Sequence, residues 1–132
     1  SNTMIKKILY WIPPILWMIL IFYLSSKSRF TATGEPLQDF LIFKALHMCE
    51  YGLLALLLFN ALYNTIKHNV SFAIRYSGLI SIVYAASDEY HQLFTPTRSG
   101  TLRDILIDGC GILITLSILH VFYKKRPLNK RI

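Results

Sequence analysis

Long apolar runs constrain this chain more than any other feature of its sequence. Four stretches are almost continuously hydrophobic, and about 20 residues of α-helix are enough to cross the hydrocarbon core of a bilayer. They cover about Ile8–Leu24, Lys44–Ile66, Phe72–Gln92 and Leu102–Tyr123. Because lipid-exposed backbone must satisfy its own hydrogen bonds, each run is expected to form a helix. The sequence therefore predicts an all-α integral membrane protein with four transmembrane helices, and a short interfacial segment, Leu37–Phe43, before the second of them.

Composition and charge placement argue against two other classes of protein. With 54% hydrophobic residues in a length of 132, the chain is too apolar for a soluble globular domain. Its formal net charge of +7 could attract nucleic acid, but the basic residues lie between and after the apolar runs, so no nucleic-acid partner is expected. We expect one domain, residues 4–132, preceded by an expression scar at residues 1–3. Cys49 and Cys110 both fall inside apolar runs and are expected to be free thiols.

The distribution of charges predicts the orientation of the four spans. The N-terminus, the second connection and the C-terminal tail carry only basic residues: Lys6, Lys7, Lys67, Arg75, Lys124, Lys125, Arg126, Lys130 and Arg131. All acidic residues lie at or near the other two connections: Glu35, Asp39, Glu50, Asp88, Glu89, Asp104 and Asp108. Because cytoplasmic loops are enriched in Lys and Arg, both termini are expected in the cytoplasm and the acidic end outside.

Polar residues at the acidic end share helical faces on three of the predicted spans. Those on the second span are Lys44, His47 and Tyr51, flanked by Glu50; those on the third are Asp88 and Gln92, with Glu89 beside them; those on the fourth are Asp104 and Asp108. Most are spaced by three or four residues, which places them on one side of a helix. Because ionisable groups are costly at membrane depth, the three faces are expected to meet in one outward-facing, partly hydrated pocket.

Two kinds of ligand suit such a pocket. Facing carboxylates need protons or a bound cation, and oxygen-rich ligation favours Mg²⁺ or Ca²⁺. The candidate metal ligands are Glu50, Asp88, Glu89, Asp104 and Asp108. Alternatively, Arg98 and Lys44 beside the start of the fourth span could seat a phosphate. The remaining candidate substrate-binding residues are Tyr51, Gln92, Arg103, Asp104 and Asp108. In a catalytic site, His47, Asp88 and Glu89 are the acid/base candidates.

Purely structural roles could explain several of the same residues. Residues 101–104 fit a capping-box pattern, which would make Asp104 part of a helix cap. Ion pairs of Asp88 with Arg98, or of Lys44 with Glu50, could fix the helix register. Small residues suited to close helix contact are Ser77, Ser81, Ala85, Gly109 and Gly111.

Three spaced motifs carry a resemblance to a known family. They are Lys44-x-x-His47-x-x-x-Tyr51, Asp88-Glu89-x-x-Gln92-x-Phe94-x-Pro96-x-Arg98 and Asp104-x-x-x-Asp108-Gly109. The chain resembles the VanZ-like family of small bacterial membrane proteins over nearly its whole length. The resemblance implies an envelope protein of the bacterial cytoplasmic membrane that lowers susceptibility to teicoplanin-type glycopeptides, and it implies no settled biochemical activity. Asp108 departs from the family pattern, in which Asn is expected, and adds a negative charge to the site.

Three functional hypotheses follow. The first is a protein that binds the phosphate-bearing or polar headgroup of a membrane lipid or a lipid-linked envelope precursor. The second is a membrane-embedded hydrolase or transferase that acts on a lipid phosphate, with or without a divalent metal. The chain lacks the Gly-x-Ser-x-Gly and His-Glu-x-x-His motifs of known hydrolases. The third is a small membrane scaffold, including a homo-oligomer, in which the charged cluster only holds helices together.

Overall fold

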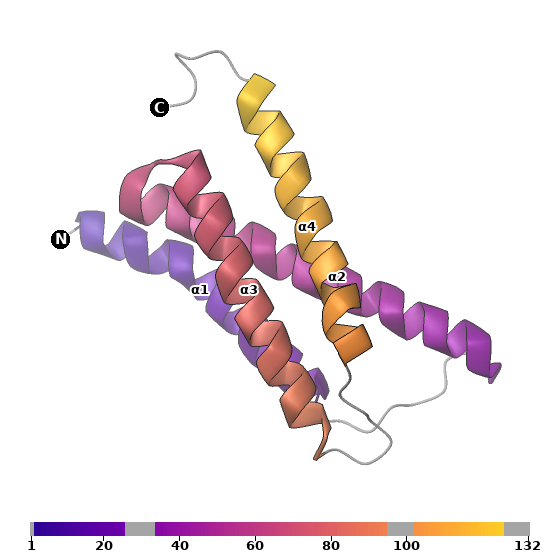
Figure 1. Cartoon of the computed structure of the whole chain (residues 1–132). Helices are drawn as coiled ribbons and strands as arrows, with labels where there is room; N and C mark the ends of the chain where they lie inside the picture. Colours follow the sequence, from indigo (N-terminus) through magenta and orange to yellow (C-terminus); the bar gives the residue numbers. More distant parts are fainter. Residues whose placement is uncertain (1, 26–33, 95–101, 126–132) are drawn as a thin grey trace.

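The computed structural model describes residues 2–25, 34–94 and 102–125. Four long helices account for nearly all of them (Figure 1). They are α1 (Asn2–Ser25), α2 (Pro36–Leu62), α3 (Val70–Gln92) and α4 (Leu102–Lys125), with a π-helical turn, Tyr63–Lys67, directly after α2. All four are long and apolar enough to cross a membrane, as the sequence predicts. The segment Leu37–Phe43 is not separate from the second span, because α2 runs through it without a break.

Helix α2 is the central element, since it contacts α1, α3 and α4. Among the described residues, α1 and α4 do not touch, so they lie on different sides of the α2–α3 pair (Figure 1). The core between these helices is built from apolar side chains that are almost completely buried: Ile21, Tyr51, Leu54, Ala55, Leu58, Ala85, Ile112 and Leu116. α2 therefore presents side chains to all of its neighbours, as a helix inside a bundle does.

The outer surface of the bundle is apolar, as expected of a protein solvated by lipid. On α1, Ile8, Ile15 and Ile19 are 55%, 51% and 60% exposed. Contiguous apolar surface of this kind is rare on soluble monomers and marks a membrane or partner interface. Two tryptophans hold α1 to the bundle through polar contacts: Trp11 Nε1 donates to Thr65 Oγ1 at 3.0 Å, and Trp17 Nε1 donates to the Glu50 carbonyl at 2.9 Å.

The close approach of α2 and α4 depends on glycine. A Cβ at Gly111 would lie 2.3 Å from the carbonyl oxygen of Met48, and a Cβ at Gly52 would lie 2.8 Å from Thr115 Oγ1. Gly109, by contrast, would meet only the tip of Ile82 at 3.4 Å, an ordinary contact. Gly111 therefore permits the helix contact that the sequence predicts for it, and it does so one turn from the polar residues of α4.

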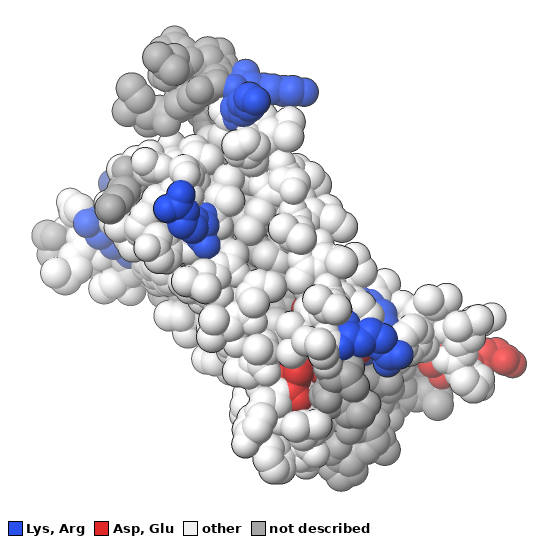
Figure 2. Space-filling model, in the orientation of Figure 1, with Lys and Arg blue, Asp and Glu red and all other residues white. Residues whose placement is uncertain are grey.

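The charges separate along the bundle. In Figure 2, Lys and Arg side chains lie at several separate places toward one end, whereas the acidic residues on the visible face lie toward the other end, beside a further basic group. This is the asymmetry from which the sequence predicts the orientation of the termini, and the orientation itself remains a prediction.

Candidate functional site

A buried ion pair joins α2 to α4 at the acidic end. Lys44 Nζ contacts Asp104 Oδ1, and both side chains are almost completely buried. Asp104 lies in the first turn of α4, where a negative charge also complements the helix dipole. The alternative pairing of Lys44 with Glu50 is not the one observed. Lys44 is instead committed to Asp104, which limits its availability for an anionic ligand.

A second contact joins the same two helices one turn further into the bundle. His47 Nδ1 lies 3.4 Å from Asp108 Oδ1, and both side chains are buried. The separation is that of an ion pair, but the geometry does not make a hydrogen bond, so Nδ1 and both Asp108 carboxylate oxygens have no hydrogen-bond partner among the described residues. The carboxylate of Asp108 thus faces the imidazole of His47.

Helix α3 joins the cluster through Asp88. The hydroxyl of Tyr51 donates to Asp88 Oδ2 at 2.7 Å, and Gln92 Nε2 approaches the same oxygen at 3.4 Å. Tyr51 is completely buried, so its ring packs in the core while its hydroxyl serves the polar site. Asp88 Oδ1 has no partner in the part of the chain that the structure describes.

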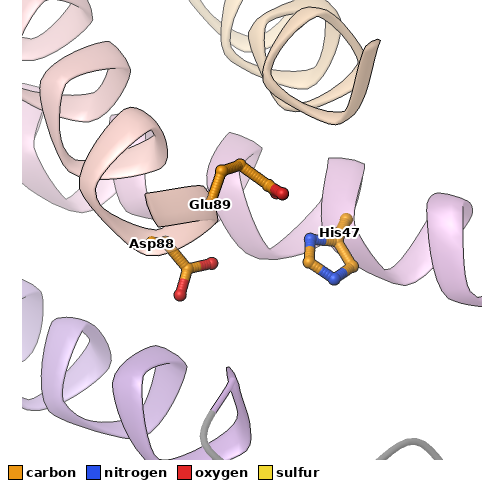
Figure 3. A group of neighbouring side chains, drawn as sticks. All are labelled: His47, Asp88 and Glu89. Atoms are coloured by element: carbon orange, nitrogen blue, oxygen red, sulfur yellow. The ribbon is translucent and has the colours of Figure 1, made fainter. Parts of the chain in front are cut away.

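Three side chains of the cluster could hold a metal ion. One ligand atom each from His47, Asp88 and Glu89 lies within 4.8 Å of the other two. In Figure 3 the Glu89 side chain extends from α3 toward His47 on α2. All three side chains are buried, and both oxygens of Glu89 lack a hydrogen-bond partner among the described residues.

The electrostatics of this group are unfavourable as it stands. Five buried carboxylate oxygens, on Asp88, Glu89 and Asp108, have no hydrogen-bond partner in the described ranges 2–25, 34–94 and 102–125. Leaving a buried charged group unsatisfied costs several kcal/mol. A cation, either bound protons or a metal, would remove most of that cost.

The edge of the cluster is formed by an arginine over an aromatic ring. Arg103 is 63% exposed in its side chain, lies 3.8 Å from Asp104 Oδ1 through Nε, and places its guanidinium 5.1 Å from the centre of the Phe40 ring. Lys44 Nζ lies 5.6 Å from the same ring. Arg103 is thus exposed, whereas Lys44, the other described lysine or arginine at this end, is buried.

A model of the VanZ/LLP1 family matches residues 8–123, which is most of the sequence. The chain belongs to the VanZ/LLP1 family. No curated protein and no solved structure matches it. The family resemblance read from the motifs is therefore confirmed.

The structure brings the VanZ motif residues of three helices into one buried cluster. Its members are Lys44, His47, Tyr51, Asp88, Glu89, Gln92, Asp104 and Asp108. The predicted roles of these residues in binding or catalysis remain predictions. Arg98, the predicted anion ligand, lies outside the described residues, as does the start of the capping box at Thr101. Because the described residues bury the cluster, the expectation of an outward-facing pocket also stays a prediction.

The candidate residue Glu50 and the neighbouring His91 lie at the margin of the cluster. Glu50 is half-buried on α2, and its carbonyl anchors α1 through Trp17. His91, at the end of α3, stacks its ring on Phe22 of α1 with centroids 4.3 Å apart, and so takes part in helix packing.

Sequence reasoning missed two contributors to this end of the VanZ-family bundle. Phe40 supports both Lys44 and Arg103, and its position one turn before Lys44 was the available signal. Helix α1 is linked to α3 next to the cluster, because the hydroxyl of Tyr84 on α3 donates to the carbonyl of Met18 on α1. No sequence spacing could have revealed that contact.

Proposed function

We propose that this VanZ-family protein binds the phosphate-bearing headgroup of a membrane lipid or lipid-linked envelope precursor, and does so through a divalent cation held by His47, Asp88 and Glu89. The observation that carries the proposal is the set of buried carboxylate oxygens without partners beside that histidine. Mg²⁺ and Ca²⁺ take oxygen ligands, which Asp88 and Glu89 would supply, whereas the imidazole of His47 suits a transition-metal ion such as Zn²⁺ better.

The charges of the cluster favour a phosphate that is bound through a metal ion over a phosphate that contacts the side chains directly. Lys44 is paired with Asp104, and His47 faces Asp108 at 3.4 Å. Asp88 and Glu89 then have no basic residue of their own among the described residues. A phosphate placed directly against them would be repelled, whereas a divalent cation would neutralise both carboxylates and would take a phosphate oxygen as a further ligand. Arg98, close in sequence to this end, is a candidate second ligand for the phosphate.

The expected setting is the bacterial cytoplasmic membrane, with both termini in the cytoplasm and the cluster toward the outer leaflet. The charge asymmetry supports this orientation. In that setting the ligand would be an outer-leaflet lipid or an envelope precursor. The phenotype we expect, as the family resemblance implies, is a lower susceptibility of the host to teicoplanin-type glycopeptides.

The first test is metal content. Purified protein would be stripped with chelator, dialysed against Mg²⁺, Ca²⁺ or Mn²⁺, and measured by inductively coupled plasma mass spectrometry. We expect wild type to retain one ion and Glu89→Gln, which preserves shape but removes charge, to lose it. Glu35→Gln is the matched control, because it removes an exposed carboxylate from the same end. If wild type retains no ion, the proposed metal site is refuted, and protonation of the buried carboxylates becomes the explanation for their lack of partners.

The second test is lipid retention. The same variants and Arg98→Ala would be placed in bilayer discs with polyprenyl phosphate, with and without Mg²⁺, and analysed by mass spectrometry. We expect wild type to retain the lipid in the presence of metal, and Glu89→Gln and Arg98→Ala to retain less. Retention that does not respond to chelation or to Glu89→Gln would contradict the metal-bridged site.

One contact also favours a catalytic variant of this function. His47 lies against a carboxylate, the arrangement in which a carboxylate orients a histidine that acts as base or acid. Polyprenyl phosphate converted to a new product by wild type, and left intact by His47→Gln, would make the protein a hydrolase or transferase in which His47 acts as acid or base and only Asp88 and Glu89 hold the metal. If wild type neither retained the lipid nor converted it, the cluster would be only a structural link between helices.

A further inference from the structure

A second candidate ligand site lies at the opposite, basic end of the bundle. A groove of about 590 Å³ is lined by residues from the start of α3 and the end of α4. Its lining includes four residues with basic side chains, Arg75, Lys124, His68 and His120, and no acidic residue. It is thus a concave surface whose charge is of one sign, and it is separate from the carboxylate cluster.

Local backbone geometry forms this groove. His68 adopts a left-handed conformation, with φ of +50°, and ends the π-helical turn with a hydrogen bond from its N–H to the Tyr63 carbonyl at 3.1 Å. Asn69 then caps α3 by accepting from the Phe72 N–H at 2.9 Å. After this turn, the start of α3 lies beside the end of α4, and residues of both line the groove.

The start of α3 adds backbone donors to the basic side chains. The first N–H groups of an α-helix have no intrahelical acceptor. Asn69 accepts from the N–H groups of Phe72 and Ala73. The N–H groups of Val70 and Ser71 have no acceptor within the helix, because they lie in its first turn. Both residues line the groove. Free helical N–H groups and the positive end of the helix dipole favour a phosphate.

Part of the remaining lining is apolar and suits the acyl chains of a lipid. Ile74 and Tyr123 line the groove, and both are only half exposed. The Tyr123 ring packs on Phe59 and Tyr63, with centroids 5.4 and 5.5 Å away. The groove therefore combines a fixed apolar wall with a cationic rim, at the end of two membrane-spanning helices where headgroups lie.

We propose that this groove binds the headgroup of an anionic phospholipid from the leaflet that the basic end faces. Arg75 and Lys124 contact the phosphate, and the start of the acyl chains lies against Ile74 and Tyr123. By the charge asymmetry this is the cytoplasmic leaflet, whose anionic surface attracts basic residues near membrane spans. The proposal is independent of the carboxylate cluster, which lies at the other end of the bundle (Figure 2).

The test uses two double variants with the same change in charge. Arg75→Gln with Lys124→Gln removes two cations from the groove. Lys6→Gln with Lys7→Gln removes two from α1, at the basic end but outside this groove. Each protein would be purified in detergent, equilibrated with phosphatidylglycerol or phosphatidylcholine, and analysed by native mass spectrometry. We expect the groove variant to retain ~25-fold less phosphatidylglycerol, about fivefold per cation, with little change in the α1 variant.

A steric variant separates a groove from a charged surface. Ser71→Trp would place a large side chain from an exposed position into the groove without a change in charge. We expect it to reduce phosphatidylglycerol retention as well. The proposed site would be refuted if the groove and α1 variants lost phosphatidylglycerol equally, or if Ser71→Trp retained it fully. Either result would indicate general attraction of the lipid to a basic surface. Retention by Glu89→Gln at the wild-type level would show that this result does not depend on the metal-bridged site.

Discussion

Replacement of Gly111 by alanine tests the geometry on which the cluster depends. The new Cβ would lie 2.3 Å from the Met48 carbonyl oxygen and 2.9 Å from the carbonyl carbon, whereas ordinary contacts begin at 3.4 Å. Both contacts are to backbone, so no side-chain rotation relieves them, and α2 and α4 would have to separate by ~1 Å. Overpacking of this kind costs up to about 3 kcal/mol. Alanine regains about 1 kcal/mol of helix propensity, which leaves a net loss of ~2 kcal/mol.

Gly109→Ala is the matched control for this variant. It makes the same substitution on the same helix, but its Cβ meets only the Ile82 side chain at 3.4 Å, so we expect no loss and a gain of up to about 1 kcal/mol. The free energy of unfolding of both variants would be measured in mixed micelles by circular dichroism. The reasoning predicts a difference of ~3 kcal/mol between them. Equal stability of Gly111→Ala and Gly109→Ala would refute the close contact between α2 and α4.

Three further predictions concern the cluster and the topology. Lys44→Met should destabilise the fold by about 3–5 kcal/mol because it leaves the buried Asp104 without its lysine, and Lys44→Met with Asp104→Leu should recover much of that loss in the same unfolding assay. Tyr51→Phe should cost about 1–3 kcal/mol, since Asp88 loses its 2.7 Å hydrogen bond in a buried site; unchanged stability would contradict that bond. Reporter fusions should show both termini in the cytoplasm, with a C-terminal fluorescent protein bright and a C-terminal alkaline phosphatase inactive, and the reverse result would refute the orientation drawn from charge.

Much of the fold could be predicted because each span is specified locally. A helix of about 20 apolar residues is the simplest way for such a run to cross a bilayer. The polar faces were equally accessible, because residues three or four apart lie on one side of a helix. Asp88 and Gln92 illustrate this, since they are four residues apart and the Gln92 amide approaches the Asp88 carboxylate.

The choice of partners could not be predicted in the same way. Lys44 pairs with Asp104, which is 60 residues away, although Glu50 is close in sequence. At ~100° per residue, a separation of six residues turns Glu50 well away from Lys44 on the same helix. Helical geometry thus argues against Glu50, but it cannot select Asp104 from the acids of the other helices.

The sequence by itself determined the four spans, the separation of charge between the two ends and the helical face on which each polar residue lies. Only the tertiary structure decided which faces meet, because the rotation and depth of each helix depend on side-chain packing. At the α2–α4 contact that packing requires the absence of a Cβ at Gly52 and, most tightly, at Gly111 against the Met48 backbone. The same approach brings His47 to Asp108, so the electrostatics of the cluster follow from a steric fit that no local pattern encodes.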